Sequence, residues 1–199
     1  PPRLAPTQIV IVPIYKNDAE KSVVMETVAR VKAGLMDAGF RLKVDEREGL
    51  TPGFKYNDWE MRGVPVRIEI GPKDVEKGTV ALARRDQPGR EGKAFVSQDG
   101  LPARVGDLLA AIQIALYERA LAFREANTHQ PKTYAEFQQV VESGWALAWW
   151  CERAECEAEI KTDTKAATRC IPFDQPGGVG QCVHCGQPAH KQAIFARAY

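Results

Sequence analysis

The segment from Thr51 to Arg85 reads T-P-G-F-K-Y-N-D-W-E-M-R-G-V-P-V-R-I-E-I-G-P-K-D-V-E-K-G-T-V-A-L-A-R-R, and it decides the fold of the first half of the chain. A short amphipathic segment ends at Gly63, and the apolar alternation of residues 64–70 predicts a strand. The charged residues 73–77 predict a turn, and a second strand then leads to an Arg-Arg pair. Aromatic side chains among charges of both signs are typical of surfaces that bind unstacked nucleotides. An ordinary charged surface of an α/β domain explains the pattern equally well.

The residues before this segment predict alternating strand and helix. Residues 8–14 form a β-branched apolar run, which indicates a buried strand. The N-x-x-E spacing of residues 17–20 predicts a capping box, and the helix that it opens is expected to end at Gly39. A second short strand is expected at 41–45, so the order strand, helix, strand favours a βαβ unit with parallel strands.

The residues after the segment complete the predicted fold. Residues 79–84 and 93–97 predict an antiparallel pair of strands, and an apolar stripe predicts a helix over 104–126. Residues 127–132 are interpreted as a linker. A second capping box at 133–136 opens a short helix. The tryptophan-rich run 145–150 predicts a strand, and its indoles are expected in a small core or between domains.

Composition limits the classes of function. The 199 residues carry a formal net charge of +1, with 44% hydrophobic and 27% charged residues, as in a soluble globular protein. Nothing resembles a signal peptide or a membrane-spanning segment, and the expected location is the cytoplasm. The weak net charge means that any nucleic-acid binding depends on the local placement of side chains. The chain begins without Met, which suggests a piece of a longer protein.

The last quarter of the chain holds all five cysteines, and four of them have the spacing of a metal site. Cys182 and Cys185 form a Cys-x2-Cys pair followed by glycine, which is typical of a turn that brings two thiolates together. Cys151 and Cys156 supply a second pair. Four thiolates favour tetrahedral Zn²⁺ with no open position, and therefore a structural metal.

Other interpretations of the cysteines stay open. Disulfides, a redox Cys-x2-Cys and unrelated free thiols all remain possible, although the absence of a secretion signal disfavours disulfides. His184 or His190 could replace one cysteine as a ligand. Cys170 has no partner at ligand spacing and is predicted to be a small buried side chain.

Together these motifs resemble the C-terminal part of prolyl-tRNA synthetases of the archaeal/eukaryotic-like type. The resemblance is carried by P-G-F-K-Y-N-D-W-E-M-R-G-V-P-V-R-I-E-I-G-P-K-D at 52–74, A-R-R-D at 83–86, both cysteine pairs and the terminal F-A-R-A-Y. It implies an α/β anticodon-binding domain at 1–130, with a mixed, mostly parallel sheet flanked by helices. A small α+β zinc-binding domain is implied at 131–199.

The resemblance also implies a function. In that family the complete enzyme is a homodimeric class II ligase that uses ATP and Mg²⁺ to attach proline to tRNA. No catalytic motif of that class occurs here, so the chain is expected to read the anticodon loop of tRNA-Pro beside an upstream catalytic domain and to be inactive alone. The terminal Tyr199 is implied to reach that active site. The alternative function is a stand-alone accessory module that binds RNA or a protein partner.

Charged and aromatic residues are the candidates for contacting the two adjacent guanines of proline anticodons. A carboxylate accepts from N1–H and N2–H₂ of guanine, a cation serves O6 or phosphate, and a ring stacks on the base. The candidates are Phe54, Lys55, Glu60, Arg62, Lys73, Asp74, Glu76, Arg84, Arg85 and Lys93. Solvated surface ion pairs would account for the same residues without RNA.

Overall fold

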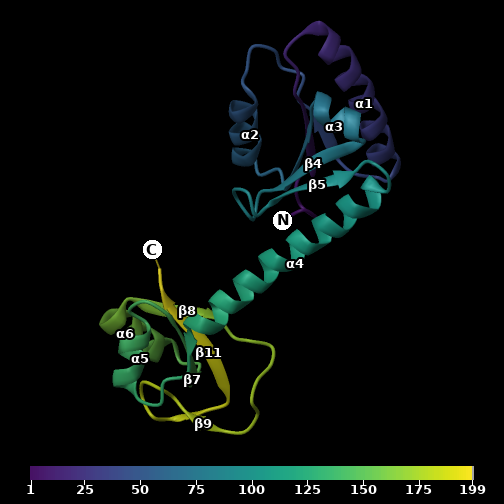
Figure 1. The fold of residues 1–199 in the computed structure, drawn as a ribbon. Coiled ribbons are helices and arrows are strands. Elements are labelled where there is room, and N and C mark those ends of the chain that lie inside the picture. The colour runs from purple at the N-terminus through teal and green to yellow at the C-terminus, as the bar shows by residue number, and fades with distance from the viewer. Residues whose placement is uncertain (199) are drawn as a thin grey trace. The chain divides into compact units, whose positions relative to one another are not determined.

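The computed structural model describes residues 1–198 and divides into two compact units, Pro1–Arg119 and Ala120–Tyr199 (Figure 1). Tyr199, the residue expected to reach an active site, lies outside the described residues. The division falls inside one long helix, and the domain boundary expected after residue 130 stays a prediction. No helix among the described residues has the length and apolar character needed to span a membrane.

Unit 1 is built on a five-stranded mixed sheet, which confirms the α/β class. In spatial order its strands are β2 (Leu42–Val44), β1 (Ile9–Pro13), β3 (Val66–Ile70), β4 (Thr79–Arg84) and β5 (Lys93–Ser97). The predicted βαβ unit is present, since β1 pairs in parallel with both β2 and β3. The predicted hairpin is present as well, because β4 pairs antiparallel with β3 and β5. Two of the four pairings are therefore parallel and two are antiparallel, so the sheet is mixed, as expected, but not mostly parallel.

The two faces of this sheet carry different helices (Figure 1). Because side chains alternate along a strand, Ile9 and Ile11 enter one core and Val10 and Val12 another. The first core packs under α1 (Asp18–Asp37) and the start of α4 (Leu101–Asn127). The second packs under α2 (Pro52–Met61), whose Trp59 lies on the valines. Polar residues of β3 that face α2 therefore lie on the same side as Glu60, one of the predicted RNA-binding residues. In contrast, α3 (Pro72–Lys77), which carries Lys73, Asp74 and Glu76, packs with α1 on the other side of the sheet.

Local sequence signals explain the helix ends. Asn17 accepts a hydrogen bond from the Glu20 amide at 2.9 Å, as the predicted capping box requires, and the chain leaves α1 through Gly39. The turn predicted at 73–77 is wrong, since α3 (Pro72–Lys77) is a short helix. Proline at its first position is preset for a helix, and the Asp74 carboxylate accepts from the Gly71 amide at 2.9 Å.

Unit 2 is a small α+β unit with its own core. Its four-stranded sheet has the order β6 (Thr128–His129), β7 (Trp145–Trp150), β11 (Lys191–Arg197) and β8 (Ala166–Cys170). A separate hairpin pairs β9 (Gly180–Gln181) with β10 (Pro188–Ala189), and the helices are α5 (Tyr134–Val140) and α6 (Ala154–Thr164). Phe137 of α5 meets Phe195 of β11 edge to face at 5.3 Å in the centre of the core.

Two expectations for unit 2 are corrected. The linker predicted at 127–132 contains β6, which pairs in parallel with β7 and joins the sheet. Cys170 is exposed. It is the last residue of β8, which lies at the edge of the sheet and has β11 as its neighbour on one side. Burial was inferred from the residue type, whereas its exposure follows from the strand order.

Candidate anticodon-binding face and metal site

The α2-facing side of the unit 1 sheet carries a row of four charged side chains, named here the ionic row: Glu60, Arg67, Glu69 and Lys93. Glu60 comes from α2, Arg67 and Glu69 from β3, and Lys93 from β5. The sheet register explains the grouping, since Arg67 pairs with Ala83, which in turn pairs with Lys93. Paired residues point to the same face, so the three strand residues converge there.

Charges of opposite sign alternate along the ionic row. Arg67 contacts Glu60 at 2.6 Å through Nη1 and Glu69 at 3.1 Å through Nε. Lys93 Nζ lies 2.7 Å from the other oxygen of Glu69. The Arg67 guanidinium also lies over the ring of Tyr56, 3.9 Å from its centroid. Both oxygens of Glu69 are thus engaged by cations, and the guanidinium is held on three sides.

Burial differs sharply along the row. The side chains of Glu69 and Arg67 are 5% and 14% exposed, whereas those of Lys93 and Glu60 are 34% and 44% exposed. Burial alone would raise the pKa of Glu69, but hydrogen bonds from Lys93 and Arg67 lower it, so the carboxylate stays ionised. Burial, together with the Glu69 charge, raises the pKa of Tyr56 and keeps its hydroxyl protonated. The row therefore presents one anion and one cation to solvent and buries the pair between them.

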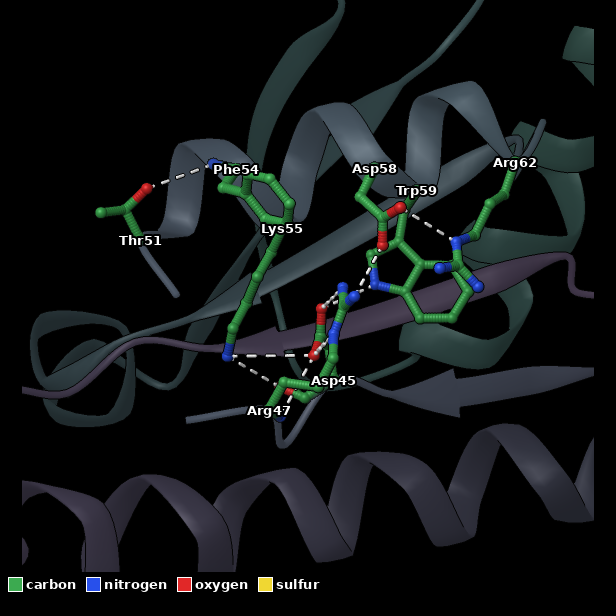
Figure 2. Close-up of polar contacts among 8 residues, drawn as sticks. All are labelled: Asp45, Arg47, Thr51, Phe54, Lys55, Asp58, Trp59 and Arg62. Carbon is green, nitrogen blue, oxygen red and sulfur yellow. Dashed lines mark hydrogen bonds and ion pairs between the residues drawn. The ribbon is translucent and has the colours of Figure 1, made fainter. Parts of the chain in front are cut away.

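A second ionic cluster anchors α2 to the end of β2. The Asp45 carboxylate is fully buried and accepts hydrogen bonds from Arg47 Nε at 2.8 Å and from the Trp59 indole at 2.8 Å (Figure 2). Lys55 donates to the Asp45 carbonyl at 3.1 Å. Burial would raise the pKa of Asp45, but the hydrogen bonds from Arg47 and Trp59 outweigh it and hold the pKa at about 2.

The structure places the predicted RNA-binding residues in different surroundings. Glu60 and Lys93 end the ionic row, and Phe54 is 54% exposed on the first turn of α2 (Figure 2). Lys55 is buried against Asp45, so its ammonium group serves the fold.

The remaining candidates are engaged to different degrees. Arg62 lies over the Trp59 ring and pairs with Asp58 at 3.1 Å. Arg84 pairs with Asp86 at 2.7 Å, and Asp74 caps α3. Lys73, Glu76 and Arg85 are exposed, as is Arg62. The roles of all ten toward RNA stay predictions.

Sequence reasoning missed the buried half of the ionic row. Arg67 and Glu69 were read only as part of an apolar strand, and Tyr56 as part of an amphipathic segment. The period-two pattern V-R-I-E-I did contain the signal, because two charges at alternate positions of a buried strand must share one face. Asp45 carried no comparable local signal, since its partners lie up to fourteen residues away.

The four predicted cysteines converge in unit 2. Their sulfur atoms all lie within 4.8 Å of one another. Cys151 follows β7, Cys156 lies in the first turns of α6, and Cys182 and Cys185 come from the β9–β10 hairpin. Two Sγ–Sγ distances, Cys156–Cys182 and Cys151–Cys185, are 3.7 Å. Four sulfurs at about 2.3 Å from a tetrahedral Zn²⁺ lie about 3.8 Å apart, so the donor set fits that ion.

The hairpin has the expected form of a metal-binding turn. Gly186 has φ of 71°, in the left-handed region, and its amide donates to the Cys182 carbonyl at 2.9 Å. Burial would raise the pKa of Cys182, but hydrogen bonds from the backbone N–H groups of Cys185 and His184 hold it at about 7. Backbone donors therefore favour the thiolate at this position, as a metal ligand requires.

The surroundings of the cluster account for the tryptophans. Trp149 and Trp150 pack against it, and a Cβ at Gly180 would overlap the Trp149 ring, so the hairpin lies directly on the indole. Trp145 meets Phe123 edge to face at 5.9 Å. Trp149 and Trp150 therefore pack against the core of unit 2, whereas Trp145 is half-buried and belongs to neither of its core clusters. His184 Nδ1 lies 3.2 Å from Cys156 Sγ, beside the four-sulfur set.

Comparison with known proteins assigns both units. Residues 8–97 match a family described as anticodon binding domain, and residues 134–199 match one described as prolyl-tRNA synthetase, C-terminal. The chain belongs to the prolyl-tRNA synthetase family. The expected resemblance is thereby confirmed, with the anticodon binding domain of this family in unit 1 and its C-terminal domain in unit 2.

Curated relatives within this family cover the whole chain. A proline--tRNA ligase of Roseiflexus castenholzii is 59% identical over 202 residues, which is 100% of this chain and 41% of that protein. The chloroplastic/mitochondrial proline--tRNA ligase of Arabidopsis thaliana is 44% identical, with 100% and 37% covered. Proline--tRNA ligase 2 of Clostridioides difficile is 42% identical, with 100% and 40% covered. The chain thus spans about two-fifths of the length of these relatives.

Proposed function

We propose that unit 1 binds the anticodon loop of tRNA-Pro and discriminates in favour of its guanines. The observation that carries this proposal is the ionic row, which offers one exposed carboxylate and one exposed ammonium group on a single face. Guanine presents two donors beside one acceptor on the edge used for pairing, so it needs both kinds of partner. In this proposal Glu60 accepts from N1–H and N2–H₂, and Lys93 donates to O6 or to a phosphate.

Stacking of a base on an aromatic side chain would add affinity for RNA that depends little on which base is stacked. Phe54 is exposed at the start of α2 and offers a flat apolar face to an unstacked base. Each base stacked on an aromatic ring contributes about 1–3 kcal/mol. The other exposed cations among the candidates, Arg62, Lys73 and Arg85, are then left for phosphate contacts, and the Glu76 carboxylate is left for solvent.

We infer further that the four cysteines of unit 2 hold a structural Zn²⁺. Four sulfur donors leave no open position, so such an ion stabilises the fold and activates no water. The ion would tie the end of β7, the start of α6 and the β9–β10 hairpin together.

We propose several further roles by analogy with the family, for a full-length protein of which this chain would be a part. They comprise proline--tRNA ligase activity, a catalytic domain in the same protein that uses ATP and Mg²⁺, a homodimer, and approach of Tyr199 to the active site. Cytoplasmic location also stays a prediction, and the name of the Arabidopsis relative points to organelles.

Binding of anticodon stem-loops tests the proposal for unit 1. Glu60→Ala is expected to weaken binding of a proline-anticodon stem-loop and to reduce its preference over a stem-loop whose two guanines are replaced by adenines. Lys93→Ala is expected to weaken binding too. A loss that is equal for both RNAs and shrinks with added salt would assign Lys93 to phosphate instead of a base.

Matched controls come from the opposite face of the sheet. Glu26 and Lys32 are exposed on α1, so Glu26→Ala and Lys32→Ala change the same charges away from the proposed face. Equal losses from these controls, or wild-type protein that binds both stem-loops alike, would disprove guanine reading by this face. Metal content measured on the same samples tests the zinc proposal, for which one ion per chain is expected.

A further inference from the structure

The buried half of the ionic row links its two exposed ends. Starting at Glu60, the contacts run to Arg67 at 2.6 Å, from Arg67 to Glu69 at 3.1 Å, and from Glu69 to Lys93 at 2.7 Å. Each oxygen of Glu69 contacts a different cation, and each end of the row has one neighbour within it. The separation between the exposed carboxylate and the exposed ammonium group therefore depends on two buried side chains.

The partners of Glu69 differ from those of Asp45, the other buried carboxylate of unit 1. Asp45 binds Arg47, whose side chain is 39% exposed, and Arg47 also pairs with Asp58 at 2.8 Å, so that cation is shared between two acidic side chains of the fold. Glu69 directs one of its oxygens to Lys93, whose side chain is 34% exposed on the edge strand β5 and which forms no ion pair with a second carboxylate among the described residues. The buried anion thus holds a cation at the surface, where a ligand can reach it.

Preorganisation is valuable for a pair of long side chains. Ordering one rotamer-rich side chain at an interface costs about 0.5–1.5 kcal/mol. A carboxylate and an ammonium group that are already held in place by neighbouring side chains avoid most of this cost when they contact one base. If they moved independently, each would have to be ordered by the RNA.

We propose that Arg67 and Glu69 couple Glu60 and Lys93 into a single guanine-reading pair, with Glu69 as the positioning residue. This inference rests on the proposed anticodon-binding function and names how its site is held. Glu69 itself is 5% exposed and does not contact the base. Its effect on recognition acts through the two cations that it binds.

A double-mutant cycle tests the coupling. The four proteins wild type, Glu60→Ala, Lys93→Ala and the double variant are titrated with the proline-anticodon stem-loop and with its adenine-substituted counterpart. In the wild-type background, the loss of guanine preference in the double variant is expected to be clearly smaller than the product of the two single losses. The same cycle is then repeated in a Glu69→Gln background, where the single losses are expected to multiply.

Glu69→Gln alone is expected to lower guanine preference by roughly tenfold, which is the size of the effect of losing one good bidentate contact to a base. Glutamine keeps the shape but loses the charge that holds two cations. Glu26→Gln, which removes an exposed carboxylate from α1 on the opposite face of the sheet, is the matched control and should leave the coupling between Glu60 and Lys93 intact.

A second variant separates positioning from folding. Glu69→Asp keeps the charge and is too short to reach both cations, so the protein should fold while the coupling is lost. Folded Glu69→Gln or Glu69→Asp protein with wild-type guanine preference and coupling would overturn the inference while leaving anticodon binding in place. Wild-type protein without any guanine preference would instead overturn the proposed function itself.

Discussion

The two units neutralise their buried anionic groups by different means. In unit 1, the carboxylates of Asp45 and Glu69 are neutralised by arginine and lysine side chains of the same unit. In unit 2, four cysteine sulfurs converge, while two nearby cations pair with glutamates: Arg153 with Glu155 at 3.5 Å, and Lys191 with Glu152, the neighbour of Cys151, at 2.9 Å. The comparison shows that unit 1 carries its counterions within its own fold, whereas the proposed zinc site would leave that role in unit 2 to a metal ion.

This difference has a consequence for stability. Ion pairs between side chains form together with the fold and respond mainly to pH. Thiolates without a counterion are unfavourable in a buried cluster, and burial raises the pKa of Cys156 accordingly. Removal of metal should therefore destabilise unit 2 and leave the stability of unit 1 unchanged. A fall in pH should destabilise unit 1, because it protonates the carboxylates of the ion pairs.

Metal removal should have the largest effect. Binding of a structural Zn²⁺ supplies about 10 kcal/mol or more at neutral pH, as much as the whole stability of many domains. A strong chelator, or Cys182→Ser, is expected to open the segments around residues 151–160 and 180–189. Hydrogen exchange resolved by peptide measures this opening, and three of the four tryptophans report on it because they lie in unit 2.

The same experiment can disprove the proposed difference between the two units. Exchange in β1, β3 and β4 should not change on chelation, because no cysteine of the cluster belongs to unit 1. Equal loss of protection in both units would show that the metal supports the whole chain. Unchanged protection in unit 2 would show that its apolar core suffices without an ion.

Substitution of Asp45 comes next in size. Asp45→Asn leaves Arg47 and Lys55 beside a neutral amide, and breaking a buried ion pair from one side costs about 3–5 kcal/mol. Urea unfolding followed through Trp59, in a variant whose other tryptophans are replaced by phenylalanine, measures the loss in unit 1. Glu48→Gln is the control, since its pair with Lys21 is exposed and exposed pairs contribute little to stability.

The pH dependence of the stability of unit 1 gives a second test of the contribution of Asp45. The pKa of Asp45 is about 2 in the folded chain, below the usual value of about 3.9 for an aspartate. A depressed pKa contributes stability above the unfolded value and loses it as the pH falls toward the folded value, here between about pH 4 and pH 2. The contribution is about 2 kcal/mol. Asp45→Asn should lack this part of the acid slope, and an unchanged slope would assign it to other carboxylates.

Local signals were sufficient to predict most of unit 1. The apolar run 8–14, the capping box at Asn17 and the antiparallel pair after residue 79 are each short-range patterns, and each is confirmed. The charged residues of α3 are as typical of a turn as of a helix, so their composition alone does not predict the helix. The signal for the helix is Pro72, whose fixed φ suits the first helical position. Cys-x2-Cys spacing was sufficient for the cysteine cluster, since ligand chemistry restricts which residues meet.

Contacts between distant residues could not be predicted in the same way. The ionic row depends on the register of β3, β4 and β5, which places Arg67 and Lys93 on one face although 26 positions separate them in the sequence. The order of strands in unit 2 also had no local signal, because β11 at the end of the chain lies between β7 and β8. Exposure of Cys170 follows from that order.

Cys170 provides the smallest expected effect and the control for the whole comparison. It is exposed at the end of β8 and does not belong to the four-sulfur set. Cys170→Ser should therefore change the free energy of unfolding by less than about 0.5 kcal/mol, as surface substitutions do, and should leave the bound metal unchanged. Metal content and thermal unfolding, measured beside Cys182→Ser, check both. Loss of metal from Cys170→Ser would mean that the fifth cysteine takes part in the site, and the contrast between the units would then depend on a different ligand set.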